Sequence, residues 1–329
     1  MKGNRFMSQK NNCNENVCKF KSKIGGQALI EGVMMRGIYK TAMVCRLPSG
    51  ELDLEEWDIK NGPNLPWYRK VPFLRGIFNF VTSLVEGYKC LSKSADKSMQ
   101  GIEEENPSKF EKWLEEKLGD KLMPIVSAIG IFLGVILAVG LFMLAPAGVT
   151  KLIGKFVTLG AVAKTIIEGI MKIAIFILYM WLTSLMPDMR RTYEYHGAEH
   201  KTIACYEAGE ELNVENVKKH TRFHPRCGTS FIFIVLIVSI VVFSVLRLPW
   251  DNILLRMVCK LALLPFIVGI GYEFIRLAGR YENWFTKLFS APGLAVQRIT
   301  TKEPDDSQIE CAIMALEAVI PENKEDDVW

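Results

Sequence analysis

Residues 122–150 read LMPIVSAIGIFLGVILAVGLFMLAPAGVT and contain no charged side chain. An apolar helix of about 20 residues crosses a hydrocarbon core of about 30 Å, so this segment predicts a transmembrane helix. Residues 228–246, GTSFIFIVLIVSIVVFSVL, are also uncharged and far too long for one strand of a soluble protein. These two segments predict the fold class, an α-helical integral membrane protein.

Two further apolar segments, residues 165–186 and 253–272, carry a few charges. Those charged residues are Glu168, Lys172, Arg256 and Lys260. Near the end of a span, long charged side chains usually extend along the helix toward the membrane surface, and we expect that here. The sequence therefore predicts about four transmembrane helices.

Four spans place both chain termini and the connection 187–227 on the same side of the membrane. More Lys and Arg residues lie close to the membrane on that side, which favours its being cytoplasmic. The first 23 residues are polar, with no apolar core of a signal peptide. The cysteines form no dense disulfide framework, which fits reduced thiols. We predict a multi-pass protein of the plasma membrane with cytoplasmic termini.

The composition narrows the range of partners. Half of the residues are hydrophobic, which excludes a disordered chain, and 40 Lys and Arg against 36 Asp and Glu leave a net charge of only +4. Such a balance does not favour nucleic acid as a partner. The lipid bilayer is the expected partner, with a membrane-protein partner or a second copy of the chain beside it. A transporter is less favoured, because no inverted repeat is visible.

The segments outside the four spans also have readable patterns. Residues 38–47 and 51–59 flank Pro48-Ser49-Gly50, which predicts a β-hairpin, and Gly25-Gly26 precedes a further possible strand. Residues 71–88 have only a short uncharged run, which favours an interfacial or re-entrant amphipathic helix. After residue 305, apolar residues recur at helical spacing, which predicts a docked amphipathic helix. In chain order, the predicted regions are a polar tail (1–23), an N-terminal soluble and interfacial region (24–121), a membrane region with the connection 187–227 (122–272) and a C-terminal cytoplasmic region (273–329).

All four histidines of the chain lie in the connection 187–227. His196, Glu199 and His200 form the order H-x-x-E-H, which on a helix places both imidazoles on one face beside the glutamate. In this order two histidines hold zinc and the glutamate serves as general base. His224 and Cys227 follow at a spacing typical of metal ligands. The predicted metal ligands are therefore His196, His200, His224 and Cys227, with Glu199 as the catalytic residue and zinc as the cofactor.

The downstream pair decides between two kinds of site. If only one of His224 and Cys227 joins the first two histidines, a fourth coordination position stays open and catalysis can follow. If both bind, the ion is closed by protein ligands and only stabilises the fold. Glu31 and Arg36 of the N-terminal segment are weaker candidates, for positioning a substrate.

Four further segments stand out in the sequence: GGQALIEGVMMRG (25–37), YHGAEHKTIACYEAGEEL (195–212), HPRCGTSF (224–231) and PGLAVQRITTKEP (292–304). In combination they resemble the YqhQ-type family of bacterial membrane proteins. The resemblance runs from about residue 24 to 320 and implies a bacterial cell membrane protein of a kind labelled as predicted metal-dependent enzymes. The motif positions of the family match His196, Glu199, His200, His224 and Cys227 here. The resemblance brings no reaction with it.

Two functions of different classes follow from these patterns. The first is a membrane-bound zinc-dependent hydrolase acting on a peptide or lipid-linked substrate at the cytoplasmic face. The second is a non-catalytic membrane scaffold or assembly factor with a structural metal site. The first predicts that Glu199→Gln keeps the metal and loses activity, and the second predicts that this change is nearly silent.

Overall fold

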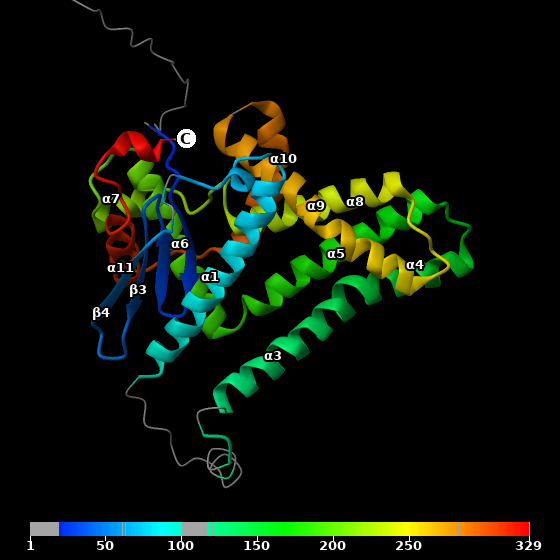
Figure 1. Ribbon diagram of the computed structural model, residues 1–329, viewed down its shortest axis with the longest axis horizontal. Helices are drawn as coiled ribbons and strands as arrows, with labels where there is room; N and C mark the ends of the chain where they lie inside the picture. The colour runs from blue at the N-terminus through cyan, green and yellow to red at the C-terminus, as the bar shows by residue number, and fades with distance from the viewer. Residues whose placement is uncertain are drawn as a thin grey trace, which may run out of the picture.

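The fold combines a small antiparallel sheet with long helices (Figure 1). The computed structural model describes residues 20–60, 62, 64–100, 113, 117–119, 122–281 and 283–328. The predicted polar tail lies almost wholly outside these residues.

The sheet is an antiparallel meander in the order β1-β2-β3-β4. Its strands are β1 (Gly25–Leu29), β2 (Gly32–Arg36), β3 (Lys40–Arg46) and β4 (Leu52–Asp58). The predicted hairpin is confirmed as β3 and β4, with Arg46 opposite Leu52 beside the turn, and the strand after Gly25-Gly26 is confirmed as β1. The sequence did not predict β2. Both faces of this strand are buried, so its residues do not alternate between apolar and polar.

Three helices from distant parts of the sequence pack with the sheet and form one unit with it, the sheet unit. They are α6 (Pro187–Glu207), α7 (Val214–Lys219) and α11 (Asp306–Glu317). Their shared core with the sheet includes Val33, Val44, Tyr195, Ile309 and Leu316. The predicted C-terminal amphipathic helix is confirmed as α11, whose first turn is capped by Asp305. The sheet unit therefore draws on three of the regions that the sequence presents as separate.

Among the described residues, three helices are long and apolar enough to cross a membrane: Ile125–Phe156, Gly228–Leu246 and Ile253–Arg280. The first covers most of α3 (Leu122–Val139), a π-helical turn η3 (Gly140–Leu144) and α4 (Ala145–Phe156), and the others are α8 (Gly228–Leu246) and α9 (Ile253–Arg280). They indicate membrane association. The fourth expected span falls on α5 (Ala161–Thr183), and its crossing of a membrane stays a prediction.

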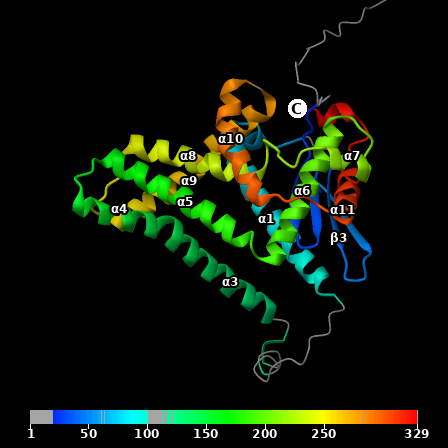
Figure 2. The same cartoon turned by 180° about the vertical axis from the view of Figure 1, so that it is seen from behind.

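The long helices extend from the sheet toward a common far end, where α9 crosses α5 and α8 (Figures 1 and 2). α5 packs against α8, and α8 packs against α9. The α4–α5 and α8–α9 connections lie together at the end of these helices that points away from the sheet. α10 (Trp284–Thr300) lies against α8 at the other end, next to the sheet unit. The long helices thus have one end at the sheet unit and a far end.

The segment expected to form an interfacial helix is part of a longer one, α1 (Leu74–Ser98). α1 packs against α9 and extends toward β3, so it links the long helices to the sheet (Figure 1). Gly76 lies directly against Tyr272 of α9, where a side chain would collide. The position of α1 relative to a membrane stays a prediction.

The charged side chains of α5 and α9 pair with one another inside the helical bundle. Arg256 Nη2 donates to Glu168 Oε2 at 2.6 Å, Lys172 Nζ lies 3.1 Å from Glu168 Oε1, and Lys260 also pairs with Glu168. Glu168 and Arg256 are each only 2% exposed. The expectation that these side chains extend to the membrane surface is therefore wrong, because each finds a partner on the neighbouring helix or on its own.

Candidate metal centre

Helix α6 carries three of the predicted site residues on one face. His196, Glu199 and His200 lie within about one turn of the helix, as the spacing predicts. Glu199 and His200 are buried. Gly197, the residue after His196, lies directly against the carbonyl of Lys302, so a β-carbon would not fit there. The lack of a side chain at Gly197 lets the chain after α10 cover the site.

Cys227 joins the two histidines from a different helix. It is the N-cap residue of α8, where its Sγ accepts a hydrogen bond from Thr229 N at 3.4 Å. His196 Nε2 lies 3.2 Å from Cys227 Sγ. One ligand atom each from His196, His200 and Cys227 lie within 4.8 Å of one another. The structure therefore brings three of the four predicted metal ligands together.

Backbone carbonyls fix the orientation of both imidazoles. His196 Nδ1 donates to Thr300 O at 2.8 Å, and His200 Nδ1 donates to Arg222 O at 2.6 Å. Because a carbonyl oxygen only accepts, each ring carries its proton on Nδ1 when neutral, and its Nε2 lone pair is available for a metal. Hydrogen bonds of this kind commonly support metal-binding histidines.

His224, the fourth predicted ligand, lies beside this cluster. Its ring centroid is 5.4 Å from that of His200, and its Nε2 accepts a hydrogen bond from Arg226 Nη2 at 3.2 Å. Gln297 of α10 holds the His224 backbone through two hydrogen bonds, of 2.8 Å to its N–H and 2.7 Å to its carbonyl. Metal binding by His224 stays a prediction, because Arg226 occupies its Nε2 in this arrangement.

Glu199 has one carboxylate oxygen without a hydrogen-bond partner among the described residues. The side chain is 5% exposed, and that oxygen is Oε2. The backbone N–H of Gly26 in β1 donates to the carboxylate, and a β-carbon at Gly26 would come within 2.8 Å of it. Burial raises the pKa of Glu199, and the neighbouring histidines partly offset that rise. Gly26 thus holds the carboxylate by a hydrogen bond, and Oε2 has a lone pair that can accept a proton.

The cluster is electrostatically coupled. Burial alone would raise the pKa of Cys227, but His196 and His200 lower it well below its usual range. Burial alone would lower the pKa of His196, but the Cys227 thiolate and Glu199 raise it to about 9. Burial and the adjacent Arg226 lower the pKa of His224 well below its usual range. These shifts favour a Cys227 thiolate paired with a protonated His196, and an unprotonated His224.

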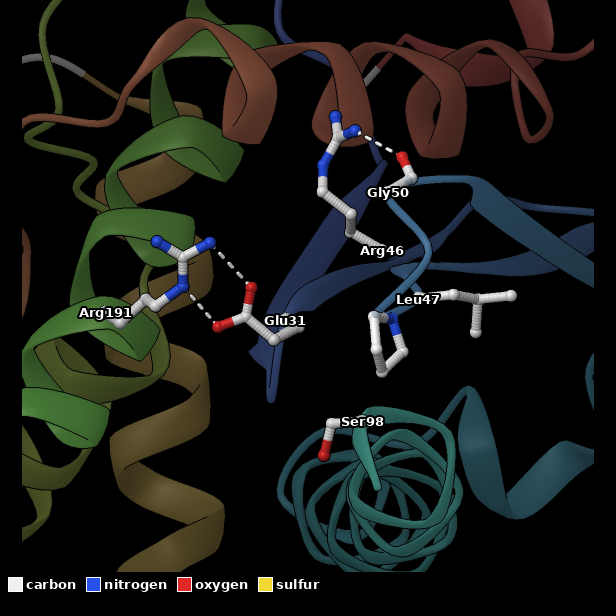
Figure 3. Close-up of a pocket in the computed structure, with 7 residues that line it drawn as sticks. Glu31, Arg46, Leu47, Gly50, Ser98 and Arg191 are labelled. Carbon is white, nitrogen blue, oxygen red and sulfur yellow. Dashed lines mark hydrogen bonds and ion pairs between the residues drawn. The ribbon is translucent and has the colours of Figure 1, made fainter. Parts of the chain in front are cut away.

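Glu31 and Arg36 lie outside the cluster. Glu31, at the β1–β2 turn, pairs with Arg191 of α6 at 2.7 Å and accepts from Tyr195 Oη at 3.2 Å, whereas Arg36 pairs with Glu86 of α1. Figure 3 shows the Glu31–Arg191 pair at the rim of an open cavity of about 390 Å³. The cavity is lined by Glu31, Arg46, Leu47, Pro48, Gly50, Ser98 and Arg191, and shares no residue with the cluster.

Several residues that support the cluster were not singled out from the sequence. They are Gly26, which holds Glu199, Thr300, which orients His196, and Gln297, which fixes His224. Each lies in one of the four segments that carry the family resemblance, so those segments were the available signal. Their roles depend on contacts between residues far apart in the chain.

The fold and the site define a class of protein in which a bundle of long apolar helices joins a small unit of sheet and helices with a buried His/Cys cluster. The chain belongs to the family described as "Protein of unknown function (DUF1385)", which matches residues 71–322. It is 34% identical over 307 residues to "Uncharacterized protein YqhQ" of Bacillus subtilis (strain 168), covering 91% of this chain and 95% of that relative. No solved structure matches. The family expected from the sequence is confirmed.

Proposed function

We propose that the protein is a membrane-bound, zinc-dependent hydrolase. The observation that carries the proposal is the meeting of His196, His200 and Cys227 ligand atoms within 4.8 Å, with the unpartnered Oε2 of Glu199 on the same helix face. The label of a metal-dependent enzyme, which came with the resemblance, belongs to this proposal.

The donor set fits Zn²⁺. Two imidazole nitrogens and one thiolate are the ligands that zinc prefers, and three protein ligands leave one coordination position open. In their neutral forms His196 and His200 present the required lone pair on Nε2, because their Nδ1 atoms donate to carbonyls; zinc would displace the proton that the raised pKa leaves on His196. Cys227 supplies negative charge, which its lowered pKa favours. A bound zinc ion would supply Lewis acidity and acidify a water molecule.

Glu199 serves as general base in this proposal. Its Oε2 is buried and unpartnered, while Gly26 holds the opposite side of the carboxylate. A carboxylate with a raised pKa accepts a proton from water more readily than an exposed one, and later returns it to the leaving group. The surrounding burial excludes bulk water and strengthens these interactions.

The position of the site favours a substrate that approaches from the membrane surface. Cys227 caps the first turn of α8, one of the three apolar helices, and Gly26 belongs to the soluble sheet. We therefore assign a peptide or lipid-linked substrate at the cytoplasmic face, in a multi-pass plasma membrane protein whose termini are cytoplasmic.

A scaffold with a structural metal is the competing function, and it needs a closed coordination sphere. Closure requires His224 to give up its hydrogen bond with Arg226 and turn its ring toward the ion. The three-donor arrangement supports an open site instead.

The first test measures metal content by elemental analysis of detergent-purified protein. We expect about one zinc per chain, lost in His200→Ala and Cys227→Ala and retained in His220→Ala. His220→Ala tests a second group of possible ligands outside the cluster, because Cys205, Glu210 and His220 also have ligand atoms within 4.8 Å of one another. In cobalt-loaded protein, thiolate-to-cobalt absorption should disappear in Cys227→Ala. Wild-type protein without stoichiometric metal would contradict the proposal.

The second test separates catalysis from a structural role. Hydrolysis of fluorescence-quenched casein and of a chromogenic acyl ester is followed in liposomes. Glu199→Gln should keep the zinc and lower the rate by about 10²- to 10⁴-fold, the usual contribution of a general base. Full metal occupancy with no hydrolysis, or with equal rates in Glu199→Gln, would favour the scaffold.

A further inference from the structure

A second buried polar cluster lies at the far end of the long helices, away from the zinc site. It joins α5 to α9 and is formed by Glu168, Lys172, Arg256 and Lys260. The α8–α9 connection covers it, and Arg256 Nη1 donates to Leu248 O in that connection at 3.1 Å. Figure 1 shows this end of the bundle opposite the sheet.

The cluster contains more positive than negative charge. Three cationic side chains share the single carboxylate of Glu168, and Glu168, Arg256 and Lys260 are each at most 6% exposed. A fourth cation, Lys164, lies 5.8 Å from the ring centroid of Trp250 beside them. Uncompensated charge is costly inside an apolar bundle, so this arrangement calls for additional negative charge.

Two buried donors in the same place lack acceptors among the described residues. They are Arg256 Nε and Trp250 Nε1. The two side chains are stacked, with the Arg256 guanidinium carbon 3.6 Å from the Trp250 ring centroid. Buried polar groups are normally paired, and unpaired ones mark a place where a ligand or water belongs. Excess positive charge and free donors thus coincide.

We propose that this cluster binds a phosphate group. Arginine and lysine together with an indole N–H offer several donors around one centre, as a tetrahedral oxyanion requires. Arg256 lies in the first turn of α9 and Glu168 in the second turn of α5. With a rise of about 1.5 Å per residue, Arg256 lies about 5 Å and Glu168 about 10 Å from the start of its helix. If these helices span a bilayer, Arg256 lies close to the headgroup region, which is about 5–7 Å thick on each side.

The phosphate has two sources with the same chemistry: an anionic phospholipid headgroup, or free phosphate entering from the aqueous side. Both would place negative oxygen atoms next to Arg256 Nε and Trp250 Nε1. Glu168 competes for the same cations, so it limits the affinity.

Thermal unfolding in dodecyl maltoside tests the proposal, with inorganic phosphate, phosphatidylglycerol or phosphatidylcholine added. We expect phosphate or phosphatidylglycerol to raise the Tm by about 3 °C or more at saturation, because ligands that bind only the folded state stabilise it. A response to phosphatidylglycerol alone identifies a lipid site, and a response to inorganic phosphate identifies a free-anion site. No Tm shift with either, or equal shifts with phosphatidylcholine and phosphatidylglycerol without a phosphate response, overturns the proposal.

Two variants link the response to this cluster. Trp250→Phe keeps the aromatic face under Arg256 but removes the indole N–H, so it should fold and show a smaller Tm shift. Trp181→Phe is the matched control, because Trp181 is exposed in the last turns of α5 at the other end; its Tm shift should equal that of the wild type. Lys260→Met should also reduce the shift. An unchanged response in both Trp250→Phe and Lys260→Met would place the bound anion elsewhere and overturn the assignment.

Discussion

The zinc site proposed on α6 and the charged cluster between α5 and α9 are both buried and polar, but they have opposite deficits. At the first, two imidazole nitrogens and a thiolate face one another near a carboxylate oxygen that has no partner among the described residues, so acceptors are in excess. At the second, three cations surround one carboxylate, and two N–H donors lack acceptors among the described residues, so donors are in excess.

The difference shows how the chemistry of a buried cluster predicts its ligand. A buried excess of lone pairs is relieved by a cation, and a buried excess of protons and positive charge is relieved by an anion. The two clusters lie at opposite ends of α8, near Cys227 and near Leu248 respectively. Each of the following experiments breaks one side of this contrast and leaves the other intact.

The largest effect is expected at the charged cluster. Glu168→Gln removes the only carboxylate that pairs with Arg256 and Lys260 in the described structure, and leaves their charges uncompensated. Breaking a buried ion pair in this way costs about 3–5 kcal/mol of stability, measured by chemical unfolding in detergent. Added phosphate should restore part of the loss. Glu56→Gln, at an exposed pair with Lys40, is the control and should cost about 0–1 kcal/mol. Equal losses of stability in Glu168→Gln and Glu56→Gln would contradict an excess of buried positive charge at this cluster.

The second prediction is that variants of the two clusters have opposite effects on zinc binding and on phosphate binding. His200→Ala should lower zinc affinity by more than about 100-fold, beyond the range typical of residues that only support a ligand, and should leave the phosphate-induced Tm shift unchanged. Trp250→Phe should do the reverse. Distant sites without shared partners behave additively. Competition titrations with a chromophoric chelator and thermal unfolding measure both responses, and loss of both in either variant would argue against two separate sites.

A smaller effect is expected from Gln297→Ala. Gln297 touches no metal ligand atom directly, but it holds the His224 backbone and donates to Ser230 Oγ at 2.9 Å. Loosening the turn that leads to Cys227 should reduce zinc affinity by about 10- to 100-fold. Gln297→Glu, which keeps the acceptor for the His224 N–H, should retain part of that affinity, whereas a purely structural role would change the Tm without changing affinity in the folded protein.

The smallest stability effect is expected from Gly26→Ala. The new β-carbon meets the flexible end of Glu199 at 2.8 Å, so the carboxylate must move, at a cost of about 1 kcal/mol. Zinc content should stay unchanged while the hydrolysis rate falls. Gly25→Ala is the matched control, because no atom lies within 4 Å of a β-carbon there. Equal hydrolysis rates in the two variants would show that Glu199 does not act as the base.

Local patterns in the sequence determined much of the fold. The uncharged segments 122–150 and 228–246 form helices, since their length and apolarity are properties of the segments themselves. The turn Pro48-Ser49-Gly50 produced the predicted hairpin for the same reason. His196 and His200 share a helix face because four residues make about one turn.

The tertiary structure decided which groups meet. The spacing left His224 and Cys227 equal as ligands, and only the packing of α10 and Arg226 around this turn separates them. Glu168 pairs with Arg256 and Lys260, which lie 88 and 92 positions further along the chain. Packing of α5 against its neighbours turns these side chains inward. Local spacing fixes which face of a helix a residue occupies. Which partner that face meets depends on packing between distant segments, and no short pattern in the sequence encodes it.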